Sequence, residues 1–274
     1  MPQRRTLLQS TSAFTIEQVQ SFAPMAQWSP VYRVATQRFV LPYSGVAEFR
    51  FGDSLALLDG ISVLCLPVDA PYQMKQIEPM QPHRGDVNSS IVISLPVASE
   101  LAVAQPRVGG LSAWAQWQLR RHWRALARSP LAQHTPLVLP VRQLLDSAFR
   151  ALPTSHTAAS AKRIHSVKRD IARRVASLDM PRWTLHDVAD TANLSPFHLA
   201  RIFKAHTGMT LHAYRQQLRL AMALQCLQGG MLHGHFNLAD LAAGLGYSSQ
   251  SHMGFAFQRE LGVTPAQARL QLAD

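Results

Sequence analysis

Residues 184–210 read TLHDVADTANLSPFHLARIFKAHTGMT, and residues 237–264 read NLADLAAGLGYSSQSHMGFAFQRELGVT. The two stretches repeat one pattern, because Leu238 follows Leu185 by 53 residues and Phe257 follows Phe203 by 54. One copy therefore carries one extra residue between its two halves. Self-similarity of this kind indicates a duplicated structural unit.

The first half of each copy begins with residues that start helices. Thr184 and Asn237 can each act as an N-cap, whose side chain accepts a hydrogen bond from the first helical turn. Asp187 and Asp240 follow three residues later, where a carboxylate stabilises that turn. Both first halves are therefore predicted to be short helices.

The second half of each copy also predicts a helix, so each copy is expected to be a helix-turn-helix unit. In the first copy Ser195 can cap this helix with Pro196 at its first position, and Gly208 can end it. Between the copies, Leu211 to Leu227 predicts a rigid connecting helix of about 25 Å at 1.5 Å per residue. Two units held about one DNA turn apart, roughly 34 Å, could enter successive major grooves. A plain helical bundle is the alternative, but it does not predict duplicated units.

Composition supports a folded protein with an anionic partner. The 274 residues include 27 Lys and Arg against 16 Asp and Glu, for a formal net charge of +11, which favours nucleic acid or a membrane surface. A hydrophobic content of 47% excludes a disordered tail protein. No apolar run approaches the roughly 18–20 residues of a bilayer span, and no signal-type segment follows Met1. We expect a cytoplasmic protein without a membrane partner.

The first hundred residues are predicted to be rich in β-structure. Turn residues separate six short apolar or alternating runs: 31–41, 46–51, 54–58, 61–66, 72–77 and 87–95. Many short strands with hairpin-length connections predict a small antiparallel barrel or jelly roll. A helical period follows from Leu111 to Leu126 and, more weakly, from Leu139 to Leu152.

The predicted fold class is α+β, with a β-rich domain and an all-α domain in one chain. The first domain spans residues 1–152 and includes the helices that follow the strands. Small and polar residues at 153–162 predict a linker. The second domain, 163–274, contains both helix-turn-helix units, and its first helix carries the apolar stripe Ile164, Val167, Ile171, Val175 and Leu178.

The run from Leu185 to Arg269 resembles the DNA-binding domain of the AraC/XylS family of bacterial transcription regulators. The resemblance is carried by His198-Leu199-x-Arg201-x-Phe203-Lys204, and above all by Gly246-Tyr-Ser-Ser-Gln-Ser-His252 with the sequel Gly262-Val-Thr-Pro265. It covers about a third of the chain, and the β-rich part is compatible with the cupin-like sensor domains of such regulators. Gly254-Phe255 departs from the family, where a small polar residue and an Arg are common. The second unit is therefore expected to read DNA weakly, or through its shape and backbone.

The resemblance implies two sets of DNA-contacting residues, most of them on the second helices and their N-caps and one, Arg219, on the connecting helix. The expected base-reading residues are Pro196, Phe197, His198, Ala200, Arg201, Gln250 and Ser251. The expected phosphate-binding residues are Ser195, Lys204, Arg219 and Ser249. Arg201 suits guanine O6 and N7, Phe197 a thymine methyl, and Gln250 adenine N6 and N7. The alternative is that Phe197 is packed and Arg201 merely solvated.

No residue pattern indicates a catalytic, metal or cofactor site. A metal-binding cupin needs clustered His and carboxylate ligands, and the first hundred residues offer only His83. The pair His233 and His235 lacks a third nearby ligand, so a solvated loop is favoured over a metal site. Cys65 and Cys226 form no zinc pattern, and Cys65 is expected to be a buried small hydrophobe rather than a redox sensor. We therefore expect no enzyme, no cofactor and no metal.

The helix predicted over Leu111–Leu126 bears an apolar stripe that includes Leu119 and Trp123. In resembling regulators a helix after the sensor barrel often pairs with its twin, so a homodimer through this stripe is expected. Trp114, Trp117 and Trp123 are expected in the core or a subunit interface. The alternative is that the stripe packs on its own barrel.

The sequence thus predicts a sequence-specific DNA-binding transcription regulator. Its expected partners are double-stranded promoter DNA, a small-molecule effector bound by the β-rich domain, and RNA polymerase if the protein is an activator. The alternative function is a nonspecific architectural DNA-binding or interaction protein with a non-catalytic β-barrel.

Overall fold

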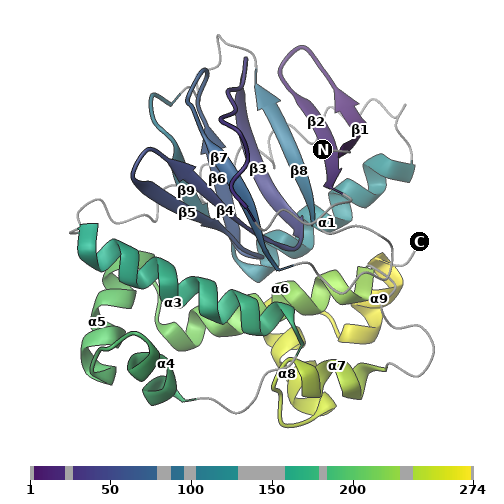
Figure 1. Cartoon of the computed structure of the whole chain (residues 1–274). Helices are drawn as coiled ribbons and strands as arrows, with labels where there is room; N and C mark the ends of the chain where they lie inside the picture. The colour runs from purple at the N-terminus through teal and green to yellow at the C-terminus, as the bar shows by residue number, and fades with distance from the viewer. Residues whose placement is uncertain are drawn as a thin grey trace. The chain divides into compact units, whose positions relative to one another are not determined.

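The computed structural model describes residues 3–21, 27–78, 88–95, 103–128, 158–178, 184–228 and 237–272. The chain divides into two compact units. The first comprises Met1–Leu111 and Gln118–Arg150, and the second comprises Ser112–Trp117 and Ala151–Asp274. Strands dominate the first unit and helices the second, so the expected α+β class is confirmed (Figure 1).

Antiparallel strands form two sheets in the first unit. The larger sheet has the order β1-β2-β8-β3-β6-β9 and the smaller has the order β5-β4-β7. The strands are β1 Gln3–Ser10, β2 Thr15–Ser21, β3 Gln37–Ser44, β4 Val46–Phe51, β5 Ser54–Leu58, β6 Ser62–Leu66, β7 Gln73–Glu78, β8 Asn88–Leu95 and β9 Arg107–Gly110. Val40 and Val92 of the larger sheet share one buried cluster with Phe49 and Leu58 of the smaller. The sheets therefore face each other across a common core, as in the expected cupin-like jelly roll.

The six predicted runs correspond to β3 to β8, and 46–51 and 54–58 have the observed bounds of β4 and β5. The first run was placed too early, because β3 starts at Gln37 rather than Val31. β1, β2 and β9 were not predicted. In β1 only Leu8 is buried, so the strand lacks the apolar alternation on which a sequence-based assignment depends.

Helix α1, Ala113–Arg128, corresponds to the predicted helix over 111–126. Its Arg120 Nη2 donates to the carbonyl oxygen of Tyr43 at 2.7 Å, and the guanidinium lies 4.9 Å from the centre of the Tyr43 ring. The exposed fractions of Leu119 and Trp123 are only 2% and 4% within the single chain. This burial favours the alternative that the stripe packs within its own chain, and the expected homodimer stays a prediction. Trp117 and Trp123 are buried as expected, whereas Trp114 is exposed in the single chain, which leaves only the subunit interface of its two expected places.

The second unit contains two pairs of short helices attached to two longer ones. The helices are α3 Ala158–Ala176, α4 Leu185–Thr191, α5 Pro196–Thr207, α6 Leu211–Gln228, α7 Leu238–Gly244, α8 Gln250–Leu261 and α9 Pro265–Leu272. Figure 1 shows α4 and α5 beside one end of α6, and α7 and α8 beside the other. The α6 helix has 18 residues, which makes it about 27 Å long, as predicted for the connecting helix. None of the described helices is both long and apolar enough to cross a membrane.

Helix α3 corrects the predicted linker. It starts at Ala158, so residues 158–162 are helical, whereas 153–157 and the predicted helix Leu139–Leu152 lie outside the described residues. Its expected apolar stripe is buried at Ile164, Val167, Ile171 and Val175.

The end of α3 makes a close contact with the second helix-turn-helix unit. A Cβ placed on Gly244 of α7 would lie 2.7 Å from the carbonyl oxygen of Leu178. Leu178 itself has a φ of 51°, in the left-handed region. Glycine at 244 thus allows the end of α7 to approach the chain that leaves α3.

Candidate nucleic-acid interface

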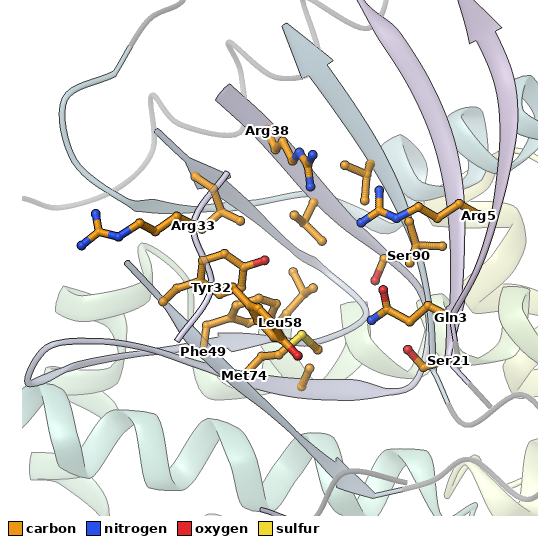
Figure 2. Close-up of a pocket in the computed structure, with 16 residues that line it drawn as sticks. Gln3, Arg5, Ser21, Tyr32, Arg33, Arg38, Phe49, Leu58, Met74 and Ser90 are labelled. Atoms are coloured by element: carbon orange, nitrogen blue, oxygen red, sulfur yellow. The ribbon is translucent and has the colours of Figure 1, made fainter. Parts of the chain in front are cut away.

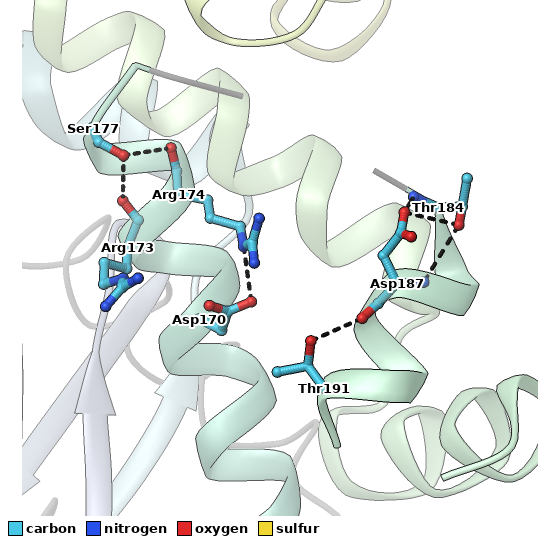
Figure 3. A network of polar contacts seen from close by, with 7 residues as sticks. All are labelled: Asp170, Arg173, Arg174, Ser177, Thr184, Asp187 and Thr191. Carbon is cyan, nitrogen blue, oxygen red and sulfur yellow. Dashed lines mark hydrogen bonds and ion pairs between the residues drawn. The ribbon is translucent and has the colours of Figure 1, made fainter. Parts of the chain in front are cut away.

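Capping boxes start the first helix of both units, as the sequence predicts. In α4 the Thr184 N–H donates to Asp187 Oδ2 at 2.5 Å, and the Thr184 Oγ1 accepts from the Asp187 N–H (Figure 3). The hydrogen bonds from the Thr184 backbone and hydroxyl hold the pKa of Asp187 below its usual value. In α7 the Asn237 N–H donates to Asp240 Oδ2 at 3.0 Å, and Asn237 Oδ1 accepts from the Asp240 N–H at 3.1 Å.

The end of α3 lies close enough to α4 to act on the same carboxylate. Arg174 Nε donates to Asp170 Oδ2 at 2.9 Å, four residues earlier on α3. Figure 3 shows this ion pair beside the capping box, and the positive charge of Arg174 also contributes to the lowered pKa of Asp187. The end of α3 thus places a positive charge near the capping box of α4.

The second helices, α5 and α8, are called the reading helices below. The Ser195 Oγ caps α5 by accepting from the His198 N–H at 3.3 Å, and the Ser249 Oγ caps α8 by accepting from the His252 N–H at 3.0 Å. Each helix ends at a left-handed glycine: Gly208 with a φ of 74° and Gly262 with a φ of 73°. A serine hydroxyl that accepts one bond can still donate its proton, so both caps remain able to bind a phosphate.

The face of α5 that is turned to solvent contains the central residues of the expected base-reading set. Phe197 is 81% exposed, which excludes the alternative that it is packed. Arg201 and Lys204 are also exposed, and the spacing of four and three residues places all three side chains on one side of the helix. Arg201 Nη2 lies 3.5 Å from His198 Nδ1, which leaves most of its donors unused. His198, Ala200 and Pro196 are half-buried beside this face.

The equivalent face of α8 has a different chemistry. The positions 54 residues after Phe197, Arg201 and Lys204 are Ser251, Phe255 and Gln258, all exposed. None of the three carries a charge. The expected reader Gln250 is exposed at the start of the same helix, and His252 is held by a 2.9 Å contact between its Nδ1 and the Ser248 Oγ.

Phe255 is a candidate contact residue that the base-reading set omitted. Its side chain is 68% exposed in the middle of α8, next to Gly254. Apolar side chains contact the methyl group of thymine in the major groove, so an exposed Phe here suits an A·T pair. The signal was present in the sequence, since Phe255 occupies the position equivalent to Arg201 in the repeat.

The extra residue of the second copy lies in the turn between its helices. The first turn runs from the C-cap Ala192 to the N-cap Ser195, and the second runs from Leu245 to Ser249. Asn193 and Gly246 follow the two C-caps with φ values of 51° and 72°, so both turns begin alike. The addition therefore falls between Gly246 and Ser249.

Arg219 lies in the interior, which corrects its expected role at phosphate. It is only 7% exposed, and its guanidinium carbon lies 3.6 Å from the centre of the Tyr247 ring. The Tyr247 hydroxyl accepts from Gln216 Nε2 at 3.2 Å, and Arg219 Nη1 donates to Gln216 Oε1 at 3.5 Å. Burial lowers the pKa of Arg219 and raises that of Tyr247. The cluster ties α6 to the turn of the second unit.

The remaining candidate residues of the sequence give no metal site in the part of the chain that is described. No group of three His, Cys, Asp or Glu there could hold a metal ion, while His83, His233 and His235 lie outside that part. Cys65 is buried, and burial raises the pKa of its thiol to about 12 against the opposing charge of Arg107. It is the expected buried hydrophobe.

The first unit contains a partly open cavity between its sheets that sequence reasoning did not find. Its volume is about 290 Å³, and residues of β1 to β8 line it, from both sheets. Figure 2 shows Phe49, Leu58 and Met74 on one side of the space, and the guanidinium groups of Arg38 and Arg5 on the other. The cavity combines an apolar wall with cationic groups, as small-molecule sites commonly do.

Two capped helix-turn-helix units on one connecting helix define a DNA-binding protein. The helix-turn-helix domain family matches residues 188–271. The HTH-type transcriptional activator RhaR of Escherichia coli (strain K12) is 26% identical over 226 residues, which cover 73% of this chain and 78% of the relative. RhaR of Shigella flexneri matches with the same values. Residues 188–271 of this chain therefore form a helix-turn-helix DNA-binding domain similar to that of AraC/XylS-type transcription regulators, as the resemblance implied.

Two solved structures also match, at lower identity. Wild-type ToxT from Vibrio cholerae, with an unsaturated fatty acid bound, matches over 96% of both chains with 12% identity and a TM-score of 0.36. A cupin superfamily protein from Desulfitobacterium hafniense matches 34% of this chain with 13% identity and a TM-score of 0.26.

Proposed function

We propose that this protein binds a promoter operator through α5 and α8, and that a small-molecule effector bound in the first unit controls that binding. The observation that carries the proposal is the solvent-facing Phe197, Arg201 and Lys204 of α5. An exposed Phe is costly in water, and an Arg beside it can donate two bonds to one guanine. These are features of a face that meets the major groove.

The two reading helices are proposed to contribute unequally. Arg201 reads a guanine and Phe197 contacts a thymine methyl, while Lys204 and the Ser195 cap hold phosphates. In α8, Gln250 and Ser251 read bases, Phe255 adds an apolar contact, and the Ser249 cap holds a phosphate. Because α8 presents no charged side chain at the three equivalent positions, its contribution to affinity is the smaller.

The cavity between the sheets supports the effector role of the first unit. It lies in the interior of a β-sandwich, where a ligand would touch both sheets and could shift their spacing. The further proposals are a cytoplasmic location, no catalytic activity, and RNA polymerase as a partner if the protein activates transcription. A homodimer would double the operator contacts.

The proposal is tested by selecting bound sequences from random double-stranded DNA with the full chain. We expect one preferred sequence with two protected major-groove segments on the same face. An architectural protein would bind all sequences equally. A flat selection, with affinity set by salt alone, would therefore exclude the regulator and favour that alternative.

A further inference from the structure

The cavity of the first unit has the size of a small ligand with a ring or a short chain. A dry cavity of 150 Å³ holds a benzene molecule, so about 290 Å³ admits roughly twice that volume. Half of the lining residues are apolar, and they come from both sheets: Val19, Val40, Ala47, Phe49, Leu58, Leu66, Met74 and Val92. The occupant is therefore expected to bury a hydrocarbon portion.

Three arginines line the cavity, but they are not equivalent. Arg33 points away from the space, and its Nη1 donates to the Asp69 carbonyl oxygen at 2.5 Å (Figure 2). Arg5 points inward and is paired with Glu17 at 3.1 Å. Arg38 also points inward, and its Nε is buried with no hydrogen-bond partner. Among the described residues, no hydrogen bond or ion pair engages the Arg38 guanidinium.

Arg38 is half-buried, and its buried Nε without a partner among the described residues is a costly feature that an anion would relieve. A carboxylate can accept two parallel bonds from one arginine, and such charge-assisted bonds are about twice as strong as neutral ones. No Asp or Glu is among the described residues that line the cavity, so no side chain there competes for Arg38. Tyr72 lies in the same wall, and burial keeps its pKa above the usual value, so its hydroxyl remains a donor.

We propose that the effector is a small apolar carboxylic acid, whose carboxylate binds Arg38 beside Arg5 and whose hydrocarbon portion fills the wall formed by Phe49, Leu58 and Met74. This assignment rests on the proposed effector role of the first unit. It names Arg38 as the residue that distinguishes an acid from a neutral molecule of the same shape.

The test compares matched acids and alcohols on the full chain by isothermal titration calorimetry. The probes are 4-phenylbutyrate and octanoate, their alcohols 4-phenylbutanol and 1-octanol, and glucose as a neutral polar molecule. We expect each acid to bind at least tenfold more tightly than its alcohol. Arg38→Gln should remove this difference, because it weakens the acid at least tenfold and leaves the alcohol within threefold.

Two further variants separate a specific site from general charge. Arg38→Lys should restore part of the acid preference, since it keeps the charge without the two-bond geometry. Arg33→Gln should bind the acids as the natural chain does. An equal loss in Arg33→Gln and Arg38→Gln would overturn the assignment to Arg38, and circular dichroism of each variant excludes unfolding as the cause.

The remaining outcomes distinguish the chemical class from the effector role itself. One outcome is that the alcohols or glucose bind as tightly as the acids and that Arg38→Gln has no effect on binding. This outcome would overturn the assignment of the effector as a carboxylic acid but would leave the effector site itself in place. Failure of every probe to bind the folded chain would count against both proposals.

Discussion

The two helix-turn-helix units share one scaffold and differ in the face that they present. α4 and α7 both have 7 residues, α5 and α8 both have 12, and each reading helix starts at a capping serine and ends at a left-handed glycine. At three equivalent exposed positions, α5 carries an arginine and a lysine, whereas α8 carries no charge. The duplication thus retains the geometry, and both faces expose a phenylalanine, but only the first presents charge at the three equivalent positions.

The largest expected difference between the units is at Arg201 and its equivalent, Phe255. Arg201→Ala should weaken binding to the selected operator by about 1–3 kcal/mol and relax the preference at one base pair. Phe255→Ala should weaken binding by less and affect a different base pair, because Phe255 makes an apolar contact where Arg201 makes two hydrogen bonds. Titrations of both variants and selection from random DNA check this. An equal cost for the two variants would contradict the unequal division of work.

The second expected difference concerns how each unit is attached. Gly244→Ala should lower the free energy of unfolding by about 1–2 kcal/mol, because the new Cβ meets the Leu178 carbonyl and the gain in helix propensity offsets only part of the overpacking. The matched control is Gly254→Ala in α8, where a Cβ meets nothing within 4 Å and stability should hold or rise. Denaturant unfolding of both variants measures the effect. An unchanged free energy of unfolding in Gly244→Ala would show that the chain around Leu178 can move to accommodate the new Cβ without a loss of stability.

A smaller difference is expected at phosphate. Lys204→Ala should weaken binding to all sequences alike and reduce the dependence of log affinity on log salt by about one unit. Gln258→Ala, the equivalent change in α8, should leave the salt dependence unchanged. Binding measured over a series of salt concentrations distinguishes the two. If Gln258→Ala also reduced the slope of log affinity against log salt, the charge of Lys204 would not explain the difference between the two units at this position.

The smallest expected effect is the pH dependence of the capping box of α4. The folded pKa of Asp187 is lowered, so its stabilisation is present above the unfolded value and is lost as pH falls through the folded one. The gap in unfolding free energy between the natural chain and Asp187→Asn should therefore narrow below about pH 4. Unfolding curves at several pH values measure it. A constant gap would show that hydrogen bonding without charge accounts for the cap.

The features that sequence reasoning predicted correctly are those with local causes. Capping residues, left-handed glycines and the 3.6-residue period act within a few positions, so the bounds of α5 and α6 followed from the chain itself. β1 was missed for the opposite reason. As an edge strand with a single buried side chain, Leu8, it has no apolar alternation to detect.

The predictions that are wrong or left open concern contacts between distant residues. The apolar stripe of α1 was correctly identified, but a stripe does not specify what covers it, and Leu119 and Trp123 proved to be buried in the single chain. Arg219 carries the positive charge expected of a phosphate ligand, but only the fold reveals that its guanidinium stacks on the Tyr247 ring. The cavity with Arg38 is assembled from eight strands, so no stretch of sequence could indicate it. The assignments of residues to bases remain predictions.

The extra residue in the second turn limits how the two units can be exchanged in an engineered regulator. One residue rotates an α-helix by about 100° and advances it by 1.5 Å. The second helices are related by 54 residues, whereas the first helices are related by 53. A graft that transfers α8 residues onto α5 with the 53-residue offset would thus rotate the transplanted face away from the DNA. Cassettes joined at Gly208 and Gly262, and cut before the capping threonine or asparagine, carry their own turn and keep their reading side outward. An exchange of whole units therefore keeps each reading face in register, whereas an exchange of separate helices does not.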